Sequence, residues 1–435
     1  MTETLAVLNE RVDDIPLLLA QLERMDVPAL LDEYFPTHGN WTGLRLGWVA
    51  GVWLAHILSE ADHRLHHVQT WAARRLETLH RCTGLPVGAL DFSDDRLANV
   101  LHTLSDDGLW SAFESRLTQH LLRVYDLRVE RVRLDSTSAS GYWSVTSAGL
   151  CQFGHSKDRR PDVPQVKVML AALDPLELPV ATDVLPGQRA DDPLSMPAIT
   201  RVRESLRSPG LLYVGDCKMA ALETRACLQA GGDGYLCPLS ALQLPAEVLQ
   251  DSLAPVWAGA QDLTWITRER ADGQRERLAE GYERVETQTA MHAGQPLTWP
   301  ERRLVVRSLH QAQAGEAALR ARLAQAQAGV AALNERGRGK ARFTAVAPWR
   351  QAVEAVLQRY RVHGLLRVDD EEHSQERRVR GDGGRPARVR VEHDVRVHTT
   401  VDEAALEAAV RRLAGVCHES ARRPPLPVPG GVGVS

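Results

Sequence analysis

The chain has 435 residues, more than one compact core usually holds, so we expect two or three domains. Its 44% hydrophobic and 25% charged residues are typical of a globular protein. The sequence has no run of about 18 apolar residues, and its first ten residues lack a basic region followed by an apolar stretch, so we expect neither a membrane span nor a signal peptide and a cytoplasmic location.

The six cysteines predict neither a disulfide framework nor a structural zinc site, because no two of them form a C-x-x-C pair. Charge is unevenly distributed: residues 1–300 hold 28 basic and 40 acidic side chains, whereas residues 301–435 hold 24 and 16. The basic C-terminal part suits a polyanion such as nucleic acid. The four lysines are Lys157, Lys167, Lys218 and Lys340. Because nearly all other basic residues are arginines, each lysine suggests a position where a compact point charge is needed. The alternative is that the four lysines are placed by chance.

Residues 1–127 are predicted to form an all-helical N-terminal domain. Apolar residues recur there at spacings of three and four, and Ser93 and Asp106 are N-cap signals before residues 97–104 and 109–125. The domain has no lysine and a net acidic balance, which favours a packing or dimerisation role over a DNA-binding helix-turn-helix, although both remain open. Its histidines His56, His63, His66 and His67 complete no metal motif.

Residues 128–245 are predicted to form the catalytic core. Residues 132–134 alternate as a strand that ends in Asp135, followed by two hydroxyl residues. Residues 166–173 and 178–185 read as a hairpin, residues 195–206 as a helix, and residues 211–214 as a buried strand that ends at Asp216. A helix over 218–229 and a strand over 235–239 follow. Two carboxylates at strand ends in this order of elements suggest a ribonuclease-H-like sheet.

Two such aspartates from separate segments suit hard divalent cations. Mg²⁺ takes oxygen ligands, usually one or two carboxylates together with substrate phosphates. A pair of Mg²⁺ or Mn²⁺ ions activates the attacking oxygen and stabilises the leaving one in phosphoryl transfer, and such a two-metal site normally needs a third acidic ligand. No P-loop and no G-x-S-x-G elbow is present. The alternative is that Asp135 and Asp216 are structural turn or capping residues.

The polar run between residues 153 and 162 is predicted to contact phosphates beside the carboxylates; an exposed charged turn is the alternative. The residues expected to bind DNA are His155, Lys157, Arg159, Arg160 and Lys218. Residues 246–345 read as a β-rich insertion followed by a long helix, and residues 346–415 as a further α/β part of the catalytic region. Residues 416–435, rich in proline and glycine, are predicted to form a disordered tail.

Several of these segments match one family. They are Leu134-Asp135-Ser136-Thr137, the run from Gln152 to Asp162 with Gly154-His155-Ser156-Lys157, Pro164-Gln165-Val166-Lys167, Leu185-Pro186-Gly187 and Gly215-Asp216-Cys217-Lys218-Met219. In the helical region His38-Gly39-Asn40-Trp41, residues 57–64 and residues 90–97 belong to the same match. With them the chain resembles the bacterial insertion-sequence transposases of the DDE, ribonuclease-H-like type.

The resemblance implies a DNA transposase that cuts at element ends and joins the freed 3′ hydroxyl to target DNA. Asp135 and Asp216 would be the first two members of its Asp-Asp-Glu metal triad. The third acid stays unknown, because Glu403, Glu407 and Glu419 lie late enough but lack the family's context. We therefore expect a C-terminally truncated, inactive form, with DNA as partner and a homodimer as an option. The alternatives are a non-catalytic DNA-binding or dimerising remnant and another ribonuclease-H-like nuclease.

Overall fold

The computed structural model describes residues 7–155, 160–240, 242–335, 346–379, 388–412 and 415–420. It is a mixed α+β protein whose contacts divide it into two compact units. The first comprises Met1–Cys237 with Thr289–Trp299, and the second Pro238–Gln288 with Pro300–Ser435. No helix in the described part of the chain is both long and apolar enough to cross a membrane.

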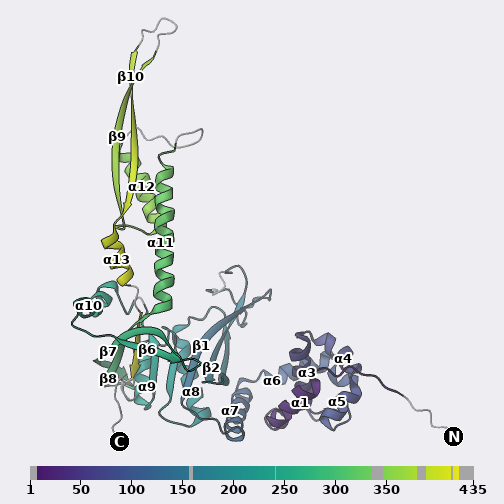
Figure 1. The fold of residues 1–435 in the computed structure, drawn as a ribbon. Helices are drawn as coiled ribbons and strands as arrows, with labels where there is room; N and C mark the ends of the chain where they lie inside the picture. Colours follow the sequence, from purple (N-terminus) through teal and green to yellow (C-terminus); the bar gives the residue numbers. More distant parts are fainter. Residues whose placement is uncertain are drawn as a thin grey trace, which may run out of the picture. The chain divides into compact units, whose positions relative to one another are not determined.

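The first unit begins with a helical region, coloured purple to blue in Figure 1. Its helices are α1 (Ile15–Arg24), α2 (Val27–Tyr34), α3 (Leu46–Glu60), α4 (Leu65–Ala73), α5 (Leu76–Thr83), η1 (Ala89–Phe92), α6 (Asp94–Leu104) and α7 (Asp107–Val124). The predicted caps are confirmed: Ser93 Oγ accepts a hydrogen bond from Arg96 N, and Asp106 Oδ1 accepts one from Leu109 N at 2.9 Å. These side chains satisfy amides that a helix start leaves without backbone partners.

The core of the helical region forms where α2 and α3 approach closely. Leu19, Leu46 and Val52 are fully buried there. Gly47 permits the approach, because a Cβ at this position would lie 1.9 Å from the carbonyl oxygen of Pro28. The Gly47 amide also donates to Asp32 Oδ1 at 2.7 Å.

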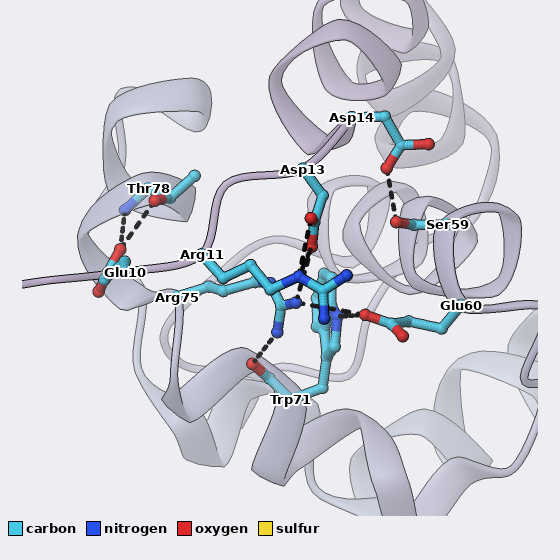
Figure 2. Close-up of polar contacts among 9 residues, drawn as sticks. All are labelled: Glu10, Arg11, Asp13, Asp14, Ser59, Glu60, Trp71, Arg75 and Thr78. Carbon is cyan, nitrogen blue, oxygen red and sulfur yellow. Dashed lines mark hydrogen bonds and ion pairs between the residues drawn. The ribbon is translucent and has the colours of Figure 1, made fainter.

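A polar clamp holds the segment before α1 against α4 and α5 (Figure 2). The side chain of Arg75 is only 6% exposed and donates to Asp13 and Glu60, each at 3.2 Å. The Glu10 carboxylate accepts from the backbone amides of Glu77 and Thr78, which lie in the first turn of α5. These contacts pair the buried guanidinium with two carboxylates and the Glu10 carboxylate with two backbone amides, which offsets the cost of removing these charges from water.

The rest of the first unit contains five neighbouring strands of a sheet in the order β3-β2-β1-β4-β5. The strands are β1 (Arg131–Ser140), β2 (Gln165–Leu173), β3 (Leu178–Pro186), β4 (Leu212–Gly215) and β5 (Gly234–Pro238). β2 runs antiparallel to β1 and β3, whereas β1, β4 and β5 are parallel. The helices between these strands are η2 (Asp192–Leu194), α8 (Ser195–Leu206) and α9 (Leu222–Ala230).

The second unit contains β-strands, two long helices and a two-stranded ribbon. Its elements are α10 (Ala246–Trp257), β6 (Thr264–Glu269), most of β7 (Arg275–His292) and β8 (Gln295–Ser308), α11 (Leu309–Ala332), α12 (Val346–Tyr360), β9 (Leu366–Val379), β10 (Arg388–Val401), α13 (Glu403–Arg411) and β11 (Gly415–Ser420). The adjoining ends of β7 and β8, within Thr289–Trp299, belong to the first unit. β9 and β10 form a separate antiparallel sheet, seen as the long yellow ribbon beyond α13 in Figure 1.

One boundary differs from the sequence-based expectation at the C-terminal end. The tail predicted for residues 416–435 overlaps β11, which pairs antiparallel with β8 from Gly415↔Val306 to Ser420↔Glu301. The sequence pattern did not predict this strand, because a segment can pair through its backbone with a neighbouring strand without a regular spacing of apolar residues. Residues 421–435 lie outside the described part of the chain.

Candidate metal-binding carboxylates

Asp135 lies within β1, on the exposed side of the strand. Val132 and Leu134 point into the core at 0% and 4% exposure, whereas Asp135 is exposed. The prediction that the strand ends at Asp135 is wrong, because β1 continues to Ser140. Residues 136–140 form a strand without an apolar pattern, because their backbone pairs with β2 as far as Ser140↔Gln165.

Asp216 follows the last residue of β4 and begins a tight turn. Its Oδ1 accepts a hydrogen bond from Lys218 N at 2.9 Å, and its carbonyl accepts one from Met219 N at 3.1 Å. Gly215 allows the turn to fold back, because a Cβ there would lie 2.9 Å from Met219 Sδ. The turn fixes the carboxylate of Asp216 at the end of the strand, where it is exposed.

The register of β1 and β4 makes the two aspartates neighbours. The parallel pairing runs from Arg131↔Leu212 to Leu134↔Gly215, so Asp135 and Asp216 each come directly after the last paired residue. Adjacent strands lie about 4.8 Å apart, and residues at equivalent positions of parallel strands project to the same face. Both carboxylates therefore lie at the point where the two strands separate, a common ligand position in sheets of this kind.

Two exposed carboxylates at this spacing fit a hard divalent cation. One oxygen of Asp135 accepts a hydrogen bond from Ser136 N at 2.8 Å. Mg²⁺ is commonly held by one or two carboxylates, with water and substrate phosphate as its other ligands. Within the described ranges no group of three or more His, Cys, Asp or Glu side chains lies together, so no third acidic ligand is assigned.

Gln165 anchors the polar loop that leaves β1 and returns at β2. Its buried side-chain amide donates to the carbonyl of His155 at 2.9 Å and to that of Gly187 at 3.1 Å. Gly154 and Gly187 leave no room for side chains, because a Cβ on either would lie within 2.3 Å of a backbone oxygen. Three of the matched sequence segments thus meet at this one point. Sequence reasoning missed Gln165 as a positioning residue, although Pro164-Gln165 already stood out in the matched motif.

The anchored loop lies farther along β1 than the sequence suggested. Gln165 pairs with Ser140, five residues beyond Asp135, which corresponds to about 16 Å at 3.3 Å per residue. The base of the loop is therefore not beside the carboxylates. A separation of this size suits a long ligand that contacts both places.

The predicted DNA-binding residues differ in their surroundings. His155 and Lys218 are exposed, whereas Lys157 and Arg159 lie outside the described residues. Arg160 donates two hydrogen bonds of 2.9 Å to Asp162, and this contact, together with Tyr142, raises the pKa of Arg160. A phosphate would have to compete with Asp162 for this guanidinium.

Lys167 has an internal partner. Its side chain is only 5% exposed, and Nζ lies 2.5 Å from Asp191 Oδ1. The ammonium therefore stabilises the segment before α8 instead of facing a ligand.

Comparison with known proteins gives no family. A scan against protein-family models finds no match, and a search of curated proteins finds none either. Among solved structures, the chain is similar to piggyBac transposase in a synaptic complex with hairpin DNA, at 12% identity over 68% of this chain and 58% of that chain, with a TM-score of 0.29. It is also similar to the Mos1 strand transfer complex, at 12% identity over 58% of this chain and 84% of that chain, with a TM-score of 0.17. TM-scores this low do not establish a common fold, and the chain spans less than two thirds of the piggyBac chain.

Proposed function

We propose that the chain is a DNA transposase of the DDE type, with a ribonuclease-H-like core built on β1 to β5. The observation that carries the proposal is the register of β1 and β4, which makes Asp135 and Asp216 neighbours. The order of β1 to β5, and the antiparallel direction of β2 among them, also support a ribonuclease-H-like core. The resemblance of the motifs around both aspartates adds the substrate class, which is DNA.

In the proposed site, Asp135 and Asp216 would hold one or two Mg²⁺ or Mn²⁺ ions. When bound, the metal supplies charge stabilisation to the attacking and leaving oxygens of a phosphodiester. The chain's own residues position the ligands: Ser136 N and Lys218 N each donate to one carboxylate and fix its orientation. The loop anchored by Gln165 would bind the same DNA about 16 Å away.

The helical region is proposed to serve packing or dimerisation rather than strong DNA contact. It lacks lysine, and residues 1–127 carry more acidic than basic side chains. Arg75, whose side chain is 6% exposed, already has two acidic partners within the region. An acidic surface gains little from counterion release on a polyanion.

The test measures metal binding and DNA cleavage on the full chain. We expect Asp135→Asn and Asp216→Asn each to abolish Mn²⁺ binding seen by electron paramagnetic resonance. We expect no joining of element-end DNA by the unaltered chain, in line with the inactive form that the sequence predicts. Asp126→Asn is the matched control, because Asp126 is exposed and has a φ of 49°, a conformation that asparagine also adopts readily. Unchanged Mn²⁺ binding in both site variants would refute the assignment.

The same assay separates the alternatives. Nicking without joining of the 3′ end would favour a nuclease with the same core. DNA binding without any cleavage would favour a non-catalytic DNA-binding protein.

A further inference from the structure

Two arginines share a face of β1 with Asp135. Val132 and Leu134 are buried, whereas Arg131, Arg133 and Asp135 are exposed, so the strand alternates between a core face and an open face. Residues two positions apart on a strand project to the same face and lie about 6.6 Å apart. Arg133 is therefore one such step from Asp135, and Arg131 is two steps away.

Both arginines pair with the same carboxylate. Arg131 Nη1 lies 2.8 Å from Asp174 Oδ2, and Arg133 Nε lies 2.9 Å from Asp174 Oδ1. The side chain of Asp174 is 4% exposed, so its charge needs a cation nearby. One guanidinium that places two N–H groups on a carboxylate is enough for this purpose. The second arginine is thus one positive charge more than Asp174 requires.

Arg133 is accessible and keeps donors for a further contact. Its side chain is 55% exposed. A guanidinium has five N–H donors, and the ion pair with Asp174 uses the groups on Nε and Nη2, at 2.9 and 3.3 Å. The residues opposite Arg133 on the neighbouring strands are Ala172 and Val214, which carry no charge. An anion can therefore reach the remaining donors while Arg133 stays paired with Asp174.

The position of Arg133 also complements that of the loop anchored by Gln165. The base of that loop lies beyond Asp135 toward the end of β1, at the pair Ser140↔Gln165. Arg133 lies on the other side of Asp135, toward the start of the strand. A ligand that runs along β1 would therefore meet contacts on both sides of the two aspartates.

We propose that Arg133 binds a DNA phosphate close to the phosphate held by the metal at Asp135 and Asp216. The inference rests on the proposed function, which supplies the metal site and DNA as the substrate. The step of about 6.6 Å along β1 corresponds to about two nucleotides at a rise of 3.4 Å for each nucleotide. Contacts on both sides of the reacting phosphate would fix its position for in-line attack.

The alternative role for Arg133 is purely structural, as a partner that keeps Asp174 paired. In that role Arg131 and Arg133 are equivalent, because they pair with the same carboxylate and lie on the same face. The two roles differ in distance: Arg131 lies about 13 Å from Asp135 along the strand, twice as far as Arg133. Arg131 is therefore the matched control.

The test is the salt dependence of DNA-duplex binding by the full chain in the presence of Mn²⁺. We expect Arg133→Gln to reduce the slope of log K against log salt by about 0.9, which is the value of one lost phosphate contact. Arg133→Lys keeps the charge and should retain the slope. Arg131→Gln removes the same charge beside the same acid and should also leave the slope unchanged. Circular dichroism and thermal unfolding compare the folds of the three variants.

The outcomes separate this inference from the proposed function. Arg133→Gln should keep the Mn²⁺ binding seen by electron paramagnetic resonance, because Asp135 and Asp216 are unaltered. If the unaltered chain binds Mn²⁺ and DNA but Arg133→Gln keeps the full slope, only the role of Arg133 is refuted. If the unaltered chain binds neither, the proposed function fails, and this inference fails with it.

Two further results would overturn the role of Arg133 alone. Equal reductions of the slope by Arg131→Gln and Arg133→Gln would mean that the two arginines attract DNA as a diffuse positive patch. Loss of the fold in Arg133→Gln, with the fold retained in Arg131→Gln, would assign Arg133 to the structure of the hairpin instead. Equal stability of these two variants is expected, because each leaves one arginine on Asp174.

Discussion

In the helical region, Arg75 is 6% exposed and its guanidinium contacts Asp13, Glu60 and the ring of Trp71. In the β9–β10 ribbon, by contrast, the side chain of Arg378 is exposed. The helical region neutralises its buried arginine internally, whereas the ribbon leaves this arginine in contact with solvent. The difference teaches that an arginine is part of the fold when it is buried against acids of its own chain, and that an exposed arginine contributes little to stability.

The largest expected effect tests how strongly packing holds the helical region. Gly47→Ala would place a Cβ 1.9 Å from the carbonyl of Pro28, and backbone cannot move aside as a flexible side chain can. We expect a loss of about 3–5 kcal/mol in the free energy of unfolding, measured by hydrogen exchange of α3 amides.

Gly51→Ala is the matched control in the same helix. Its Cβ would meet no atom closer than 3.7 Å. The change should stabilise α3 by up to about 1 kcal/mol, because alanine has the higher helix propensity. Equal losses from both glycine variants would contradict the packing argument.

The next effect compares the two kinds of arginine directly. Arg75→Met removes the cation beside Glu60 and leaves Asp13 with Arg11 alone, and it should lower the stability of the helical region by about 2–3 kcal/mol. Arg378→Met in the ribbon should change stability by less than about 0.5 kcal/mol, because its side chain is exposed. Thermal unfolding and hydrogen exchange measure both variants. A cost for Arg378→Met as large as that for Arg75→Met would make the ribbon arginines structural and remove the contrast.

A smaller effect is expected where the ribbon meets α13. Asp402 caps this helix: Oδ1 accepts from Ala405 N at 3.0 Å, and Oδ2 accepts from Arg367 at 3.0 Å. Both contacts lower the pKa of Asp402, and the hydrogen bond from Ala405 contributes more than the one from Arg367. Asp402→Ala should cost about 1 kcal/mol, seen as faster exchange of the α13 amides, whereas Asp402→Asn should cost less because asparagine also caps helices. Exchange that is equally fast in both variants would assign the effect to the lost charge instead.

The smallest effect concerns pH and the helical region. Burial lowers the pKa of His56, which is 2% exposed and packs edge-on against Trp71. Below the unfolded pKa of about 6.5 the unfolded chain takes up a proton that the folded chain does not, so stability falls as pH falls. Between pH 7 and pH 6 this loss is at most about 0.7 kcal/mol. His56→Phe should reduce the pH dependence of α3 exchange in that range; an unchanged dependence would point to another group.

Several local features were predictable from the sequence because neighbouring residues decide them. The caps at Ser93 and Asp106 and the helix α8 (Ser195–Leu206) follow from side chains within one helical turn and from apolar spacing. The hairpin of β2 and β3 also lies within a residue of its predicted bounds. The two aspartates stood out because each follows a short segment with apolar residues in the sequence.

Only the tertiary structure decided what these elements bring together. The parallel register of β1 and β4, between residues about 80 apart in the sequence, makes Asp135 and Asp216 neighbours, and pairing with β2 extends β1 past Asp135. The anchor at Gln165, the partners of Arg75 and the strand β11 likewise depend on distant segments. Local periodicity specifies which residues face a core, but the register between strands sets which functional groups meet, and it is fixed only when the segments pack.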